Sequence, residues 1–164
     1  MKKGFSAKND GFNSQKWHKS CDDKGKTLVI IKTKDNFIFG GFTEVGFTTD
    51  KLKWRKNDRR REEGYIPDLN AFIFSLRNDK GDRNPKKFPL QNYYEKYAIK
   101  YQLSKVAVFG SDIELFSNLK YGYSGFGSSY KLPNGIQFNT EEATSYLAGC
   151  QNKWEVDELE TYFI

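Results

Sequence analysis

The sequence is poor in cysteine, histidine and methionine. Its 164 residues include two cysteines, Cys21 and Cys150, one histidine, His18, and one methionine. Two cysteines are too few for the disulfide framework of a small secreted domain. A structural zinc site usually needs four ligands in closely spaced pairs, and here only His18 and Cys21 are close in the sequence. We therefore expect a reduced protein without a metal or other cofactor.

Long apolar runs are also missing. No stretch approaches the roughly 20 apolar residues of a membrane-spanning helix. The opening residues MKKG are followed by polar residues, where a signal peptide would have an apolar core. We therefore expect a cytoplasmic monomer without membrane insertion, and the length suits a single domain over residues 1–164.

Aromatic residues are abundant and predict a sheet-rich fold. They form 16% of the chain, mostly as Phe and Tyr, which are typical of strands. Strands are expected at 27–32, 37–42, 71–76 and 153–164. A short strand is expected at 128–130, and two or three short strands within 93–116. Short helices are expected at 13–21, with Asn13 or Ser14 as the capping residue, and at 140–149, with Thr140 as the capping residue. The predicted fold class is α+β, mainly β: an antiparallel two-sheet β-sandwich with a few short peripheral helices.

Local signals add detail to this prediction. The strands at 27–32 and 37–42 should form a hairpin, and Gly40-Gly41 indicates a bulge or a close approach of another backbone. In the last strand the apolar pattern changes parity after Val156, so we expect a bulge near Asp157. Charged segments at about 50–64 and 77–92 are interpreted as loop insertions.

Charge is distributed unevenly along the chain. The whole chain carries +6, and so do residues 51–61 alone, with seven basic residues and one acid. Residues 141–160 carry six acids and one lysine. This polarity favours docking on a charged partner. The basic residues of the segment are Lys51, Lys53, Arg55, Lys56, Arg59, Arg60 and Arg61.

Seven segments in order give the chain a resemblance to a known family. They are DGFNSQKWHKSCDDKGKTLVIIK (10–32), FGGFT (39–43), DLNAFIFSL (68–76), FGSDIEL (109–115), SSY (128–130), YLAG (146–149) and WEVDELETY (154–162). In these segments the sequence resembles the TLDc domain of oxidation-resistance-type proteins. The resemblance implies a two-sheet sandwich and a link to protection against oxidative stress. It also implies binding to the cytosolic sector of the proton-pumping V-ATPase, and no established enzymatic activity.

The chain departs from the family pattern at several positions. Phe42 stands where the family usually has Tyr, Cys150 where Ser is usual, and a Trp is expected near Phe47. The basic insertion at 50–64 is longer than expected. A partner surface that included this insertion would differ from that of the family.

The segment WHKSCDD raises an alternative, enzymatic hypothesis. His18 and Cys21 are three residues apart on the predicted helix, close enough for an imidazole to activate a thiolate in thiol or peroxide chemistry. Glu158 and Glu160 share one face of the last strand and could supply a carboxylate. The structural interpretation is favoured for both pairs, because free cysteine is usually buried and such glutamates commonly pair with cations or a partner.

A third hypothesis concerns nucleic acid. Seven cations around Trp54 could contact phosphates and stack on a base. A solvated loop and an acidic protein partner rank ahead of it. The preferred prediction is a non-enzymatic interaction module whose partner-binding residues include this basic segment together with Glu158 and Glu160.

Overall fold

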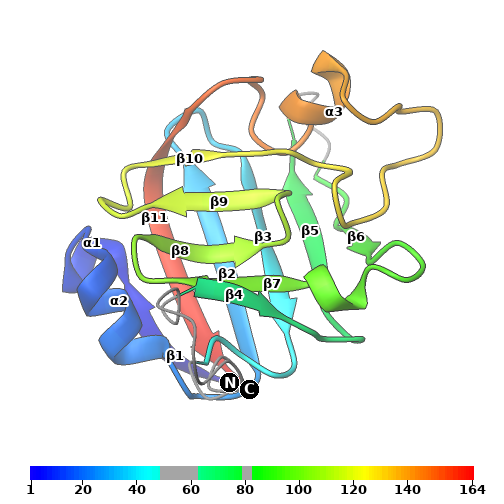
Figure 1. Ribbon diagram of the computed structural model, residues 1–164. Helices are drawn as coiled ribbons and strands as arrows, with labels where there is room; N and C mark the ends of the chain where they lie inside the picture. Colours follow the sequence, from blue (N-terminus) through cyan, green and yellow to red (C-terminus); the bar gives the residue numbers. More distant parts are fainter. Residues whose placement is uncertain (49–62, 79–82) are drawn as a thin grey trace.

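The computed structural model describes residues 1–48, 63–78 and 83–164 (Figure 1). Its strands are β1 (Lys2–Ser6), β2 (Thr27–Thr33), β3 (Ile38–Thr43), β4 (Glu63–Ile66), β5 (Phe72–Arg77), β6 (Lys86–Pro89), β7 (Ile99–Gln102), β8 (Lys105–Phe109), β9 (Ile113–Phe116), β10 (Tyr121–Tyr123) and β11 (Trp154–Phe163). Its helices are α1 (Ala7–Asp10), α2 (Ser14–Cys21), α3 (Glu141–Ser145) and the 3₁₀ helix η2 (Glu95–Tyr97). The fold is therefore mainly β, as predicted.

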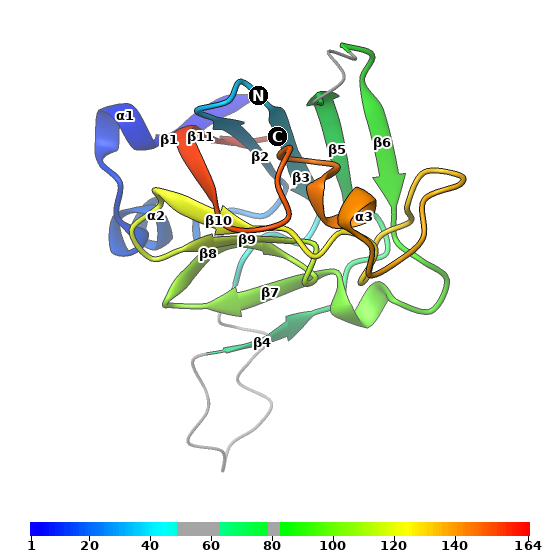
Figure 2. The same cartoon turned by 90° about the horizontal axis from the view of Figure 1, so that it is seen from above.

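The strands of the described residues form one antiparallel sheet. Its order is β4-β7-β8-β9-β10-β11-β2-β3-β5-β6, and β1 pairs with β11 beside this path. The predicted sandwich of two sheets is not confirmed. The reason lies in β11, which pairs with β2 from Val156 onward and with β10 through Trp154 and Glu155. One long strand thus joins both groups, and Figures 1 and 2 show β7–β10 crossing the face of β11, β2 and β3.

The core lies between these two groups of strands. Phe109 of β8 packs where Gly41 of β3 has no side chain, since a Cβ there would lie 2.6 Å from the Phe109 ring. Phe47 meets Phe109 edge to face, and Phe39 meets Trp154 in the same way. The predicted close approach of another backbone is found at Gly40, where a Cβ would lie 1.9 Å from the Val29 carbonyl oxygen; at Gly41 a side chain approaches instead. The β2–β3 register is continuous, so the pair makes no bulge in that hairpin.

The predicted bulge in the last strand is confirmed. The pairing of β11 with β2 shifts between Val156 and Glu158. Trp154 and Val156 are buried before the shift, and Leu159 and Thr161 are buried after it. The extra residue lets the apolar positions of both parities face the same core.

Two loop predictions need correction. Residues 77–92 contain β6, which pairs with β5 as the last strand of the path; its one proline, Pro89, fits an edge strand. The strand expected at 128–130 is only a single bridge between Tyr130 and Leu90. Within 50–64, β4 begins at Glu63, while residues 49–62 lie outside the described residues.

The short helices were largely predicted. The Asn13 side chain accepts a hydrogen bond from the Lys16 N–H and caps α2, and the Thr140 side chain caps α3 through the Ala143 N–H. α3 is shorter than expected, and Gly149 follows it at a positive φ of 78°. Among the described residues, no helix has the length and apolar character needed to span a membrane.

Candidate functional site

His18 is held by groups other than Cys21. Its Nε2 lies 3.0 Å from the Lys105 carbonyl oxygen, and its Nδ1 lies 2.9 Å from Asp22 Oδ1. A carbonyl only accepts, so Nε2 carries the proton of that bond. The Tyr101 hydroxyl donates to Asp22 Oδ2 at 2.8 Å. Both imidazole nitrogens are thus occupied in a network that joins α2 to β7 and β8.

Cys21 is fully buried beneath α2. Burial raises the pKa of its thiol to about 12; a hydrogen bond with Thr161 opposes this effect, and the charges of Asp22 and Asp10 add to it. A thiol in such surroundings is almost wholly protonated at neutral pH and is a poor nucleophile. The helix therefore places Cys21 as a core residue.

Glu158 and Glu160 lie on the opposite side of β11 from Thr161, and thus away from Cys21. Glu158 Oε1 accepts hydrogen bonds from the Lys8 N–H at 3.2 Å and the Leu159 N–H at 3.0 Å. Glu160 pairs with Lys3 and accepts from the Tyr162 hydroxyl at 2.7 Å. The hydrogen bond from Lys3 has the larger effect in lowering the pKa of Glu160, and the hydrogen bond from Tyr162 lowers it further. These glutamates attach the N-terminal segment to β11.

The structure does not bring the predicted chemical residues to one place. Thiol and imidazole have separate partners, and the two carboxylates face another side of the sheet. Among the described residues, no group of three or more His, Cys, Asp and Glu side chains could hold a metal. The seven basic residues between Lys51 and Arg61 lie outside the described residues.

An apolar groove of about 330 Å³ lies on the outer face of β2, β5 and β6. On β2, Leu28 and Ile30 line it, while the alternate residues Val29 and Ile31 are buried in the core. Lys87 lies over the ring of Phe72, with its Nζ 4.0 Å from the ring centroid. The groove is lined by Leu28, Ile30, Phe72, Phe74, Leu76, Pro85, Lys86 and Lys87.

Gly40 of β3 lies between the two strands, β2 and β5, that supply most of the groove lining. It pairs with Ile30 on one side and with Phe74 on the other. A Cβ at Gly40 would lie 1.9 Å from the Val29 carbonyl oxygen and 2.9 Å from the tip of the Phe74 ring. The absent side chain therefore lets the tip of the Phe74 ring pack against the backbone of Gly40.

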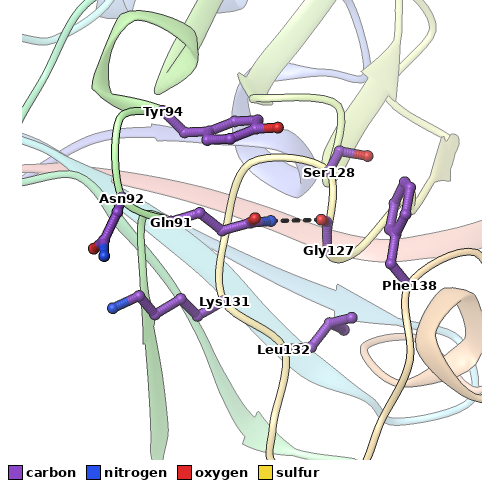
Figure 3. Close-up of a pocket in the computed structure, with 8 residues that line it drawn as sticks. All are labelled: Gln91, Asn92, Tyr94, Gly127, Ser128, Lys131, Leu132 and Phe138. Carbon is purple, nitrogen blue, oxygen red and sulfur yellow. Dashed lines mark hydrogen bonds between the residues drawn. The ribbon is translucent and has the colours of Figure 1, made fainter.

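A second, more polar cavity of about 600 Å³ lies beside the loop at 125–132 (Figure 3). The Gln91 amide donates a hydrogen bond to the Gly127 carbonyl oxygen at 2.6 Å. Tyr94 and Phe138 stand at two sides of this amide in Figure 3. The lining residues are Gln91, Asn92, Tyr94, Gly127, Ser128, Lys131, Leu132 and Phe138.

Asp112 holds the loop that forms this cavity. Its carboxyl oxygens accept from the N–H groups of Gly127 at 2.7 Å and Ser129 at 2.8 Å. Burial raises the pKa of Asp112 to about 7, although the backbone donors act in the opposite direction. Sequence reasoning identified residues 109–112 as a turn and missed this role, because the bonded loop is more than a dozen residues away.

Sequence reasoning also missed the apolar groove. The only signal was that 27–32 is apolar at successive positions, which was interpreted as burial on both faces. The observed pattern alternates between buried and half-buried residues. Apolar residues at two of the half-buried positions, Leu28 and Ile30, are a sign of a second contact surface.

Comparison with known protein families gives a match to the TLDc domain over residues 1–164, the whole chain. The search of curated proteins gave no match. The matched range includes all seven segments that carry the resemblance, from residues 10–32 to residues 154–162. The chain belongs to the TLDc domain family.

Proposed function

We propose that this TLDc domain is a non-enzymatic, cytoplasmic interaction module that docks on the cytosolic sector of the V-ATPase and contributes to protection against oxidative stress. The partner and the stress link come from what the family resemblance implies. The apolar groove between β2 and β5 carries the proposal on the side of this chain, because it offers a contact surface without an evident catalytic group.

The groove has the character of a protein contact. Leu28, Ile30 and Leu76 expose apolar surface in one place, which is typical of interaction sites when the exposed residues are contiguous. Lys87 at its edge adds positive charge beside the Phe72 ring. A partner segment with apolar side chains and a neighbouring carboxylate would complement this surface.

The geometry of the thiol supports a non-enzymatic role. A nucleophilic cysteine needs an exposed, electropositive setting and a base within reach. Cys21 is buried, with a pKa near 12, and the imidazole of His18 is bound by Asp22 and Lys105. These contacts favour a structural role for the WHKSCDD segment.

The test is a pulldown from cell extract with the purified chain as bait and an unrelated β-sandwich as the reference. We expect V-ATPase subunits to be enriched on the TLDc chain. Leu76→Glu, which puts a carboxylate into the groove, should reduce the capture at least tenfold. Lack of enrichment over the reference protein would contradict the proposed partner.

Leu103→Glu is the matched control. Leu103 is 44% exposed in the turn between β7 and β8, away from the groove. The same change of charge there should leave the capture unaltered. Equal losses with both variants would show that charge alone is responsible, and capture unaffected by Leu76→Glu would place the contact elsewhere on the domain.

A further inference from the structure

Exposed aromatic side chains gather in one region of this molecule. Among the described residues, six aromatic side chains are exposed, and five of them belong to β4, to the segment around η2, or to the rim of the polar cavity. They are Tyr65, Tyr93, Tyr94, Tyr97 and Phe138, whereas Tyr123 lies apart on β10. Exposed rings are costly in water, so their clustering indicates a binding surface.

Three of these tyrosines form a continuous row. The ring centroids of Tyr65 and Tyr97 are 5.1 Å apart, and those of Tyr97 and Tyr94 are 6.0 Å apart. Their exposed fractions are 41%, 37% and 39% in the order Tyr65, Tyr97, Tyr94. Tyr94 also lines the polar cavity, on whose rim Phe138 stands (Figure 3). The tyrosine row, defined as Tyr65, Tyr97 and Tyr94, therefore leads into the cavity.

Positive charge follows the same path. Lys96 Nζ lies 4.9 Å from the ring centroid of Tyr97, and Lys100 Nζ lies 5.7 Å from that of Tyr65. Lys131 lines the cavity. Among the side chains that the structure describes, no carboxylate forms an ion pair with these three lysines, and Glu95 is the acid next to them in the chain. Three ammonium groups thus accompany the rings.

We propose that the tyrosine row and the adjoining cavity bind single-stranded nucleic acid. Unpaired bases would stack on Tyr65, Tyr97 and Tyr94, and backbone phosphates would contact the lysines beside them. This combination of aromatic platforms with a positively charged path is how proteins bind single strands without strong sequence preference. A duplex offers its bases only at their edges, so it would not use the rings.

The cavity suits one nucleotide at the end of the row. Tyr94 and Phe138 line it with their rings, and Asn92 and Lys131 are also among its lining residues. Side-chain amides recognise the edges of unstacked bases, and lysine neutralises phosphate. This inference stands on different residues from the groove and is independent of the V-ATPase proposal.

The experiment measures fluorescence anisotropy of labelled 12-nucleotide oligo(U) and oligo(dT), and of a 12-base-pair duplex, with the full 164-residue chain. We expect both single strands to bind more tightly than the duplex. The double variant Tyr94→Ala/Tyr97→Ala should weaken single-strand binding by about tenfold or more, since stacking contributes measurably for each base. The double variant Tyr94→Phe/Tyr97→Phe, which keeps the rings, should bind like the parent and guards against an effect of misfolding.

Matched controls lie elsewhere on the surface. Tyr123→Ala removes an aromatic ring that is 42% exposed outside the row. Lys153→Gln removes an ammonium that lies 4.2 Å from the Tyr121 ring centroid, in the same kind of contact as Lys96. Both variants should bind like the parent. Lys96→Gln and Lys100→Gln should each make the plot of log K against log salt less steep, by about one unit of slope.

Several outcomes would overturn the proposal. Oligonucleotide binding that survives Tyr94→Ala/Tyr97→Ala would assign it to other residues, such as the basic segment at 51–61. Two results would show that the surface binds anions in general: equal affinity for the duplex, and displacement of the oligonucleotide by poly-glutamate as readily as by unlabelled oligonucleotide. Absence of binding at low salt would exclude it.

Discussion

The Trp17 indole N–H donates a hydrogen bond to Thr161 Oγ1 at 2.9 Å, across 144 positions of sequence. Both residues are fully buried, and the indole ring also meets Phe47 edge to face at 5.1 Å. This contact attaches α2 to the strand that joins both parts of the sheet. The helix is only eight residues long and would be marginal by itself, so its position depends on such tertiary contacts.

Trp17→Ala should lower the free energy of unfolding by about 3–5 kcal/mol, because it removes a large buried aromatic side chain and leaves a cavity. Urea unfolding followed by circular dichroism measures this change. Thr161→Val is the partner experiment: it keeps the shape but leaves the indole N–H unpaired, at a cost of about 1–3 kcal/mol. A loss below 1 kcal/mol for Trp17→Ala would contradict the role of the helix anchor.

Cys21 should resist thiol reagents in the native state. With a pKa near 12, roughly one thiol in ten thousand is ionised at pH 8. We expect the Cys150→Ser variant to react with a maleimide only after denaturant is added, and the Cys21→Ser variant to react in the native state through the half-buried Cys150. Rapid labelling of Cys21 in the native protein would support the alternative hypothesis that Cys21 is a reactive thiol.

His18→Ala should act on stability and leave partner capture unchanged. The change removes the bonds to Asp22 and to the Lys105 carbonyl, at a cost of about 1–3 kcal/mol. The pulldown is performed well below the melting temperature of the variant, with the folded fraction checked by circular dichroism. Loss of capture by a folded His18→Ala chain would mean that α2 belongs to the partner surface.

Features with a local sequence signal were predicted well. The β2–β3 hairpin follows from two apolar runs around Lys34-Asp35-Asn36, and the bulge in β11 follows from the parity change after Val156. The capping residues Asn13 and Thr140 were also recognised. In each case the residues that cause the feature are close together in the sequence, so the local pattern is sufficient to predict it.

Features that depend on distant pairing were not predicted. β6 contains two lysines and a proline, and it is a strand because β5 offers it an unpaired edge. The single sheet results from the pairing of β11 with both β10 and β2. The groove brings together Ile30 and Phe74, which lie on strands at either side of Gly40. No local periodicity reports which strands become neighbours.

Asp112→Asn should destabilise the domain by about 1–3 kcal/mol, because both carboxyl oxygens can accept a hydrogen bond, even when one carries a proton, whereas the amide NH₂ group only donates. Its NH₂ group would face the N–H of Gly127 or Ser129, both of which now donate to Asp112. Chemical denaturation at pH 5 measures the loss. Asp35→Asn, in the exposed β2–β3 turn, is the control and should have little effect.

The stability difference between the parent and Asp112→Asn should also depend on pH. Burial raises the pKa of Asp112 from 3.8 to about 7, so the folded state binds this proton more tightly than the unfolded state does. The contribution is therefore complete below about pH 4 and is lost as the pH rises through about 7. Unfolding of both proteins at pH 4.5, 6 and 8 should show the parent losing its advantage with rising pH. If the advantage of the parent grows with pH instead, Asp112 is ionised in the folded protein. The backbone N–H groups of the loop at 125–132 then stabilise its charge by more than burial destabilises it.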